Sequence, residues 1–192
     1  MATVGSFDVL KLLTEVDKFS DTDQVEKLRL LAMAVVPYGK IEGPDKRVIE
    51  IFKTIEAKHD ERAIPIITRL LEKASFRRKF ITQLQQQPAC ETTFLVPDLY
   101  FTELLVDVAD DLGNGEYLRR LKNRIPDSQL GMSRDRITTA VQLFQQLLFG
   151  ETLSLKKEME SLTLLAEWLS DIGRQDIANK VEKEKETSKC SL

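Results

Sequence analysis

Apolar residues recur along this chain with the spacing of an α-helix, about 3.6 residues per turn. The pattern is clearest in residues 164–181, where apolar side chains lie three or four apart on both sides of Gly173. They are Leu165, Trp168, Leu169 and Ile172 before the glycine, and Ile177 and Val181 after it. Because glycine often ends a helix, this stretch predicts two helices that meet at Gly173.

Arg174 and Asp176 stand at the start of the second of these helices. Two residues that are two apart on an α-helix do not face each other, so a simple helical pair between them is excluded. We therefore expect each of these charged side chains to find its partners elsewhere in the fold.

The helical spacing covers most of the chain. It predicts further helices around residues 7–19, 25–35, 44–55, 64–71, 76–84, 99–108, 118–125, 137–148 and 159–168. Alternating apolar and polar residues, which are typical of strands, do not occur in a convincing run. The predicted fold class is all-α, with two bundles of short helices.

A polar segment at residues 85–93, which contains Pro88, separates two similar halves. Four groups match in order: Leu12-Leu13 and Val16 with Leu104-Leu105 and Val108, Val25 and Leu28 with Leu118 and Leu121, Val36-Pro37 with Ile125-Pro126, and Ile51-Phe52 with Leu143-Phe144. We interpret them as an approximate duplication. The predicted parts are a first domain at 1–86, a short linker at 87–97, a second domain at 98–183 and a disordered tail at 184–192. A short linker beside the apolar residues 94–96 favours two halves that pack together.

Composition excludes several classes of partner. The formal net charge is -3, so the chain lacks the broad basic field that favours nucleic acid. No apolar run reaches the roughly 18 residues that a membrane-spanning helix needs, and the first residues do not resemble a signal peptide. We expect an intracellular protein without membrane insertion. Cys90 and Cys190 do not make a disulfide framework.

The sequence also offers little for catalysis. His59 is the only histidine and stands in a polar break, where we expect a solvated side chain, so a complete catalytic triad is not predicted. Asp107, Asp110 and Asp111 lack the glycine and the terminal glutamate of a calcium loop, and a solvated helix face explains them better. We expect no enzyme, no cofactor and no metal. A helical enzyme that uses the acids from Asp107 to Glu116 is the alternative from another class.

Three motifs carry a resemblance to a known family: Ile125-Pro126, Leu143-Phe144-Gln145-Gln146-Leu147 and Arg174-Gln175-Asp176-Ile177. Together with the duplication, they resemble tandem death effector domains. Residues 164–185 are similar, without gaps, to the end of the second domain in cellular and viral FLICE-like inhibitory proteins. The first two motifs are equally similar to the prodomains of death-receptor initiator caspases.

This resemblance implies two tandem death-fold six-helix bundles packed together. It also implies a cytoplasmic, non-enzymatic regulator of apoptosis that joins death-inducing complexes and blocks the recruitment or activation of initiator caspases. The implied partners are the Fas-associated death domain adaptor, initiator caspases and copies of the chain itself. The alternative function is a prodomain fragment of an initiator caspase, which promotes assembly.

The family also implies where partners bind. An acidic residue of the second helix forms a charge triad there with the Arg and Asp of the last helix. In this chain the resemblance assigns Arg174, Asp176 and Ile177 to partner binding, with Glu116 as the candidate acid. The first half carries Arg77-Arg78-Lys79-Phe80 at the equivalent place, with Lys79 where Asp is expected.

The two halves therefore differ in charge. Arg77, Arg78 and Lys79 form a basic cluster in the first half, whereas Glu103, Asp107, Asp110 and Asp111 make the first helix of the second half acidic. Unlike surfaces of this kind favour head-to-tail contacts, which extend or cap an assembly. We expect the acidic helix to dock on a basic partner, while the altered first half fails to recruit the next subunit.

Overall fold

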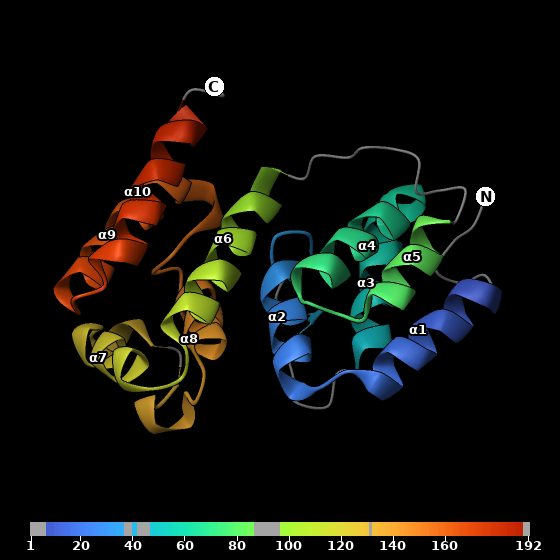
Figure 1. The fold of residues 1–192 in the computed structure, drawn as a ribbon, viewed down its shortest axis with the longest axis horizontal. Coiled ribbons are helices and arrows are strands. Elements are labelled where there is room, and N and C mark those ends of the chain that lie inside the picture. Colours follow the sequence, from blue (N-terminus) through green and yellow to red (C-terminus); the bar gives the residue numbers. More distant parts are fainter. Residues whose placement is uncertain (1–6, 37–39, 42–46, 87–96, 131, 190–192) are drawn as a thin grey trace. The chain divides into compact units, whose positions relative to one another are not determined.

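The computed structural model describes residues 7–36, 40–41, 47–86, 97–130 and 132–189, and the ribbon in Figure 1 shows helices joined by turns and loops. None of these described residues forms a strand, so the predicted all-α class is confirmed. In the same part of the chain, no helix combines the length and the apolar character needed to cross a membrane.

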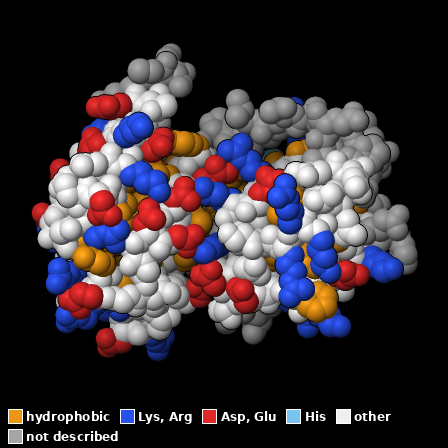
Figure 2. Space-filling view, in the orientation of Figure 1, with side chains coloured by type: hydrophobic (Ala, Val, Ile, Leu, Met, Phe, Trp, Pro, Cys, Tyr) orange, Lys and Arg blue, Asp and Glu red, His pale blue; other side chains and the backbone are white. Residues whose placement is uncertain are grey.

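The chain divides into two compact units, Met1–Glu103 and Leu104–Leu192. The division falls inside one helix, α6 (Pro97–Leu112). The predicted linker at 87–97 lies, except for Pro97, outside the described residues, as do residues 94–96 and both cysteines. On the face shown in Figure 2, acidic and basic side chains are interspersed.

The first unit contains most of its helices as the apolar pattern predicts. They are α1 (Phe7–Phe19), α2 (Thr22–Ala32), α3 (Val48–His59), the 3-10 turn η2 (Asp60–Arg62), α4 (Ala63–Lys73) and α5 (Arg78–Gln85). Asp21 begins α2 with a capping box, because its carboxylate accepts from the Gln24 backbone N–H while the Gln24 side chain accepts from the Asp21 N–H. Pro65 lies in the first turn of α4, where a missing N–H costs little.

The second unit continues from α6 through α7 (Glu116–Arg124), α8 (Ala140–Phe149), α9 (Glu158–Asp171) and α10 (Gln175–Lys189), with 3-10 turns η4 (Asp127–Gln129), η5 (Arg134–Arg136) and η6 (Leu155–Lys157). Asn114-Gly115 makes the corner between α6 and α7, as the flanking helical spacing predicts. The Asn114 side chain also accepts from the Ala140 N–H and so caps the start of α8.

Each unit buries its own apolar stripe, and three of the four matched groups lie on corresponding helices, whereas the Val36-Pro37 group follows α2 and its Pro37 lies outside the described residues. The pairs fall on α1 and α6, on α2 and α7, and on α3 and α8. The largest fully buried aromatic side chains are Phe52, Phe80, Phe101 and Phe144. The core is therefore built from the residues that the periodicity selects.

The C-terminal segment differs from the expected disordered tail at 184–192. The helix α10 continues to Lys189, and only residues 190–192 lie outside the described chain. The Lys185 ammonium lies 3.3 Å from the Glu182 carboxylate, one turn earlier, and the Thr187 hydroxyl donates to the Lys183 carbonyl. Such local contacts extend a helix without an apolar stripe.

Candidate functional site

The corner between α9 and α10 positions the charged residues that the sequence singled out. Gly173 has φ +83, in the left-handed region that glycine enters without steric cost. The Arg174 N–H then donates to the Leu169 carbonyl at 2.8 Å, which closes the end of α9. As a result, Arg174 lies just before α10 and Asp176 lies in its first turn.

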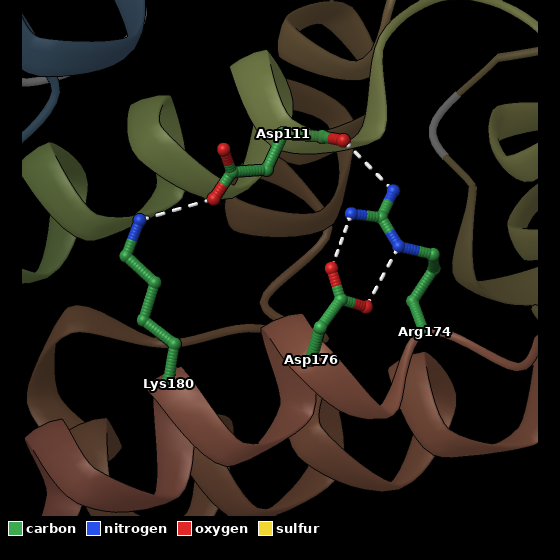
Figure 3. Close-up of polar contacts among 4 residues, drawn as sticks. All are labelled: Asp111, Arg174, Asp176 and Lys180. Atoms are coloured by element: carbon green, nitrogen blue, oxygen red, sulfur yellow. Dashed lines mark hydrogen bonds and ion pairs between the residues drawn. The ribbon is translucent and has the colours of Figure 1, made fainter.

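Arg174 and Asp176 bind each other directly. The Arg174 Nε donates to Asp176 Oδ1 at 2.8 Å and its Nη2 donates to Oδ2 at 2.7 Å, as Figure 3 shows. The expectation that Arg174 and Asp176 would not pair with each other is therefore wrong, whereas Arg174 does have a further partner elsewhere in the fold. The helical geometry behind it does not apply, because α10 begins at Gln175 and Arg174 is outside the helix. We call this two-bond pair the Arg174–Asp176 fork.

Two further contacts fix the fork against α6. The Arg174 Nη1 donates to the Asp111 carbonyl at 2.8 Å, near the C-terminal end of that helix, where the helix dipole favours a cation. The Asp111 carboxylate accepts from the Lys180 ammonium at 3.0 Å. In Figure 3, α6 and α10 lie on opposite sides of this network, which therefore ties the last helix to the first helix of the unit.

An aromatic ring completes the surroundings of Arg174. The Arg174 guanidinium lies 4.8 Å from the centroid of the Tyr117 ring, and the Arg120 guanidinium lies 5.8 Å from it. Cations at such distances are attracted by the ring quadrupole. Tyr117 is 38% exposed, so the ring also forms part of the surface.

Hydrogen bonding makes the fork strongly ionic. The bonds from Arg174 lower the pKa of Asp176 to about 2, although desolvation acts in the opposite direction. The same bonds raise the pKa of Arg174. The Arg174 side chain is 16% exposed and that of Asp176 is 65% exposed. The fork thus presents a fixed carboxylate to the outside, supported from beneath by its guanidinium.

Glu116 does not occupy the place that the resemblance implied. Its carboxylate accepts from Arg119 and from Arg120, each at 2.9 Å, and these bonds lower its pKa. The residue beside Arg174 is its neighbour Tyr117. The sequence already indicated this, because the best alignment of the leucines places Glu116 one position away from the acidic residue that the resemblance expects. One residue turns a helical side chain by about 100°, which is enough to move it off this face.

Ile177, which the resemblance assigned to partner binding, is 2% exposed and belongs to the core, where its side chain anchors α10. Tyr117 and Lys180 were not among the predicted site residues. Asp111 had been considered as a metal ligand and as part of the acidic first helix of the second half, but not as a partner of Arg174. No sequence pattern links these residues to Arg174, since they meet only when α6, α7 and α10 pack.

A pocket of about 480 Å³ adjoins the fork. It lies between α7 and the corner that carries the fork, and it is lined by Arg120, Asn123, Arg124, Asp171, Ile172 and Gly173. Arg124 donates to Asp171 across it at 2.6 Å. Gly173 of the pocket directly precedes Arg174, and Arg120 of the pocket lies beside the Tyr117 ring.

Arg77, Arg78 and Lys79 lie in the first unit, at the start of α5, and all three are exposed. The corner that leads to them, between α4 and α5, contains residues 74–77. It is one residue longer than the corner between α9 and α10 in the second unit, residues 172–174. Ser75 takes the left-handed conformation there, with φ +59. No fork of the Arg174–Asp176 kind forms among these three residues, because Lys79 provides no carboxylate.

The described residues contain no group of three His, Cys, Asp or Glu side chains that could hold a metal ion. His59, expected to be solvated, is half-buried at the end of α3, and its Nε2 lies 2.8 Å from the Val35 carbonyl oxygen. This arrangement fixes the imidazole against the backbone.

The chain was also compared with known proteins. No protein-family model matches the chain, and no curated protein matches it closely enough to be identified as a relative.

Proposed function

We propose that this chain is a non-enzymatic regulator of apoptosis that joins death-inducing signalling complexes in the cytoplasm. In this proposal each half is a six-helix death fold, and the chain binds the Fas-associated death domain adaptor or an initiator caspase through death effector domain contacts. It blocks caspase recruitment by occupying a surface. Its effect is stoichiometric, because binding without turnover inhibits only as many partner molecules as the chain can cover.

The observation that carries this proposal is the half-exposed Arg174–Asp176 fork. Its carboxylate is 65% exposed while its guanidinium is held by Asp176, the Asp111 carbonyl and the Tyr117 ring. An exposed ion pair contributes little to folding. A pre-organised charge pair on a surface is instead well suited to binding, because it loses little side-chain entropy when a partner docks.

Two further features support the proposal. The duplication gives corresponding helices in each unit, and the fork stands at the start of the last helix, where the resemblance assigns partner binding. The first half has Lys79 in place of the carboxylate. A chain with one such fork offers unlike surfaces to a growing assembly, as expected of an inhibitor that joins a complex without extending it.

The test compares Asp176→Ala with the parent chain. We expect the variant to keep its melting temperature within a few degrees while its binding to filaments of an initiator caspase prodomain weakens by at least about tenfold. Asp127→Ala is the matched control, because Asp127 is 80% exposed and pairs with Arg134 at 2.9 Å elsewhere in the same unit. Co-sedimentation with preformed filaments measures binding.

Equal binding by parent and Asp176→Ala would remove the fork from the proposed interface. A parent chain that does not sediment with the filaments, or with the adaptor's death effector domain, would refute the proposed function itself. The direction of the effect is read from caspase activation: the proposal expects added chain to lower it, whereas an increase would indicate a promoter of assembly.

A further inference from the structure

An aromatic side chain in the first unit is exposed and surrounded by cations. Phe19, at the end of α1, is 45% exposed. The Lys18 and Lys79 ammonium groups each lie 5.6 Å from the centroid of its ring, and the Arg77 guanidinium lies 5.2 Å from it. Arg78 is also exposed, at the start of α5. We call these five residues the Phe19 patch. Figure 2 shows hydrophobic atoms bordered by basic side chains on the part of the surface where α1 ends.

The cations of the Phe19 patch have no counter-ion within the described part of the chain. No carboxylate there lies within ion-pair distance of any of the four, and α5 itself contains no Asp or Glu. The second unit provides the contrast, because its stacked cation, Arg174, is matched by Asp176. Cations gathered around one ring repel each other, so anions supplied from outside relieve that repulsion.

The corner that carries two of these cations is held in place by the rest of the unit. The Gln24 side chain donates to the Ser75 carbonyl at 2.9 Å. The next side chain, Phe76, is 6% exposed, and its N–H donates to the Leu71 carbonyl at 3.0 Å, which closes the end of α4. These contacts fix the backbone that directly precedes Arg77. The patch is therefore pre-organised, and its backbone loses little entropy when a ligand binds.

The acidic residues nearest to Phe19 in sequence do not cancel this positive charge. Asp23 is already paired with Lys27 at 2.8 Å. The Asp21 carboxylate accepts the capping bond of α2 and lies at the N-terminal end of that helix, where the helix dipole is positive. Asp17 stands two positions before Phe19 on α1, and side chains two apart on a helix do not face each other. The Phe19 patch therefore presents a net positive charge around an apolar centre.

An apolar ring bordered by long basic side chains suits the interface of a membrane. The ring enters the boundary between headgroups and acyl chains, while Lys and Arg side chains extend to the charged headgroups around it. The cations here come from two helices and surround the ring at similar distances, 5.2–5.6 Å. Lipids diffuse laterally, so each cation meets a headgroup of its own, whereas a folded partner must present acids at one matching spacing.

We propose that the Phe19 patch binds the anionic phospholipid headgroups of a membrane surface. The chain then lies on the membrane without crossing it, with the ring at the centre of the contact and the four cations around it. The contact uses the first unit and not the Arg174–Asp176 fork. It is therefore independent of whether the fork binds a death effector domain.

Co-sedimentation of the full chain with phosphatidylcholine vesicles, with and without phosphatidylserine, tests the contact. We expect reversible binding only where phosphatidylserine is present, and we expect it to weaken as salt rises, because exposed charges are screened. Arg77→Glu/Lys79→Glu should raise the apparent dissociation constant by at least about tenfold, since each basic side chain near an anionic surface contributes to binding. Arg136→Glu/Lys156→Glu is the matched control, with the same change in net charge at an exposed arginine and an exposed lysine of the second unit.

Two further variants separate a lipid surface from a protein partner. Arg77→Lys/Lys79→Arg exchanges the two cations and should keep the apparent dissociation constant within about twofold, because a fluid lipid surface responds to charge. A protein partner that binds the planar guanidinium would distinguish arginine from lysine. Phe19→Trp places an indole at the centre of the patch, and vesicles with brominated acyl chains should quench its fluorescence. Trp168 is 4% exposed in the core, so the fluorescence of the parent chain should remain unquenched.

A parent chain that does not bind phosphatidylserine vesicles at low salt would overturn the inference. So would equal binding to phosphatidylcholine alone, an equal loss in the control variant, or an unquenched Phe19→Trp. Binding of soluble polyglutamate without binding of vesicles, lost in Arg77→Glu/Lys79→Glu, would assign the patch to an acidic protein instead. Circular dichroism checks that each variant is folded, and Lys18→Glu/Arg78→Glu replaces the first variant if that chain has lost helicity. None of these measurements uses caspase filaments, so they leave the proposed function to its own test.

Discussion

Replacing Gly173 by alanine tests the corner on which the fork depends. A Cβ at this position would meet no atom within 4 Å, so the loss comes only from holding a non-glycine residue at φ +83. That conformation costs about 1–2 kcal/mol, and the stiffer unfolded chain of the alanine variant offsets about 0.4–1 kcal/mol. We expect a net loss of about 1 kcal/mol, which lowers the melting temperature of a unit of this size by roughly 4–8 °C.

Two matched variants separate backbone strain from crowding. Gly173→Asn should lose less stability than Gly173→Ala, because asparagine enters the left-handed region more readily. Gly150 has an ordinary φ of -77, but a Cβ there would lie 3.3 Å from the carbonyl oxygens of Gln129 and Gln146. Gly150→Ala should therefore lose stability through crowding, and asparagine at that position should not reduce the loss.

Thermal and urea denaturation followed by circular dichroism measure these differences. An unchanged melting temperature for Gly173→Ala would refute the left-handed corner. A loss above about 3 kcal/mol would show that the space beside Gly173 is not open, since backbone strain alone does not reach that value.

The remaining predictions concern the fork and its ring. The pKa of Asp176 should be near 2 in a carbon-detected NMR titration, and Arg174→Gln should move it toward 3.8. The pKa of Asp176 is lower in the folded chain than in the unfolded chain. Its contribution to the free energy of unfolding is therefore present above pH 3.8 and is lost as the pH falls through about 2. A parent chain in which Asp176 titrates near its ordinary pKa would contradict the fork. Tyr117→Phe should leave stability and filament binding unchanged, whereas Tyr117→Leu should lose about 0.5–1 kcal/mol of stability together with part of the binding. Equal behaviour of these two variants would show that the ring does not hold Arg174.

Periodicity in the sequence predicted the helices and the residues of each core. The reason is that an amphipathic helix is a local structure, since side chains three and four apart share a face wherever the helix later packs. The meeting of α9 and α10 at Gly173 was predicted for the same reason, because the left-handed residue that ends a helix depends on that residue and its immediate neighbours. Three of the four matched groups likewise lie on corresponding helices.

The site required the tertiary structure. Whether Arg174 faces Asp176 depends on where α10 begins. The helix begins at Gln175, so Arg174 lies outside it and can bind Asp176; a helix that began one residue earlier would include Arg174 and separate the two side chains. Whether Tyr117 or Glu116 lies beside Arg174 depends on how α7 is rotated against its neighbours.

Asp111 meets Arg174 and Lys180 across more than sixty positions of sequence. Phe19 likewise meets Arg77 and Lys79 although α2, α3 and α4 intervene along the chain. Local spacing carries no information about such contacts, because they form only when helices that are distant in sequence pack side by side. The sequence alone therefore determined which faces are buried in each helix, and the packing of the helices determined which charges and rings meet on the surface.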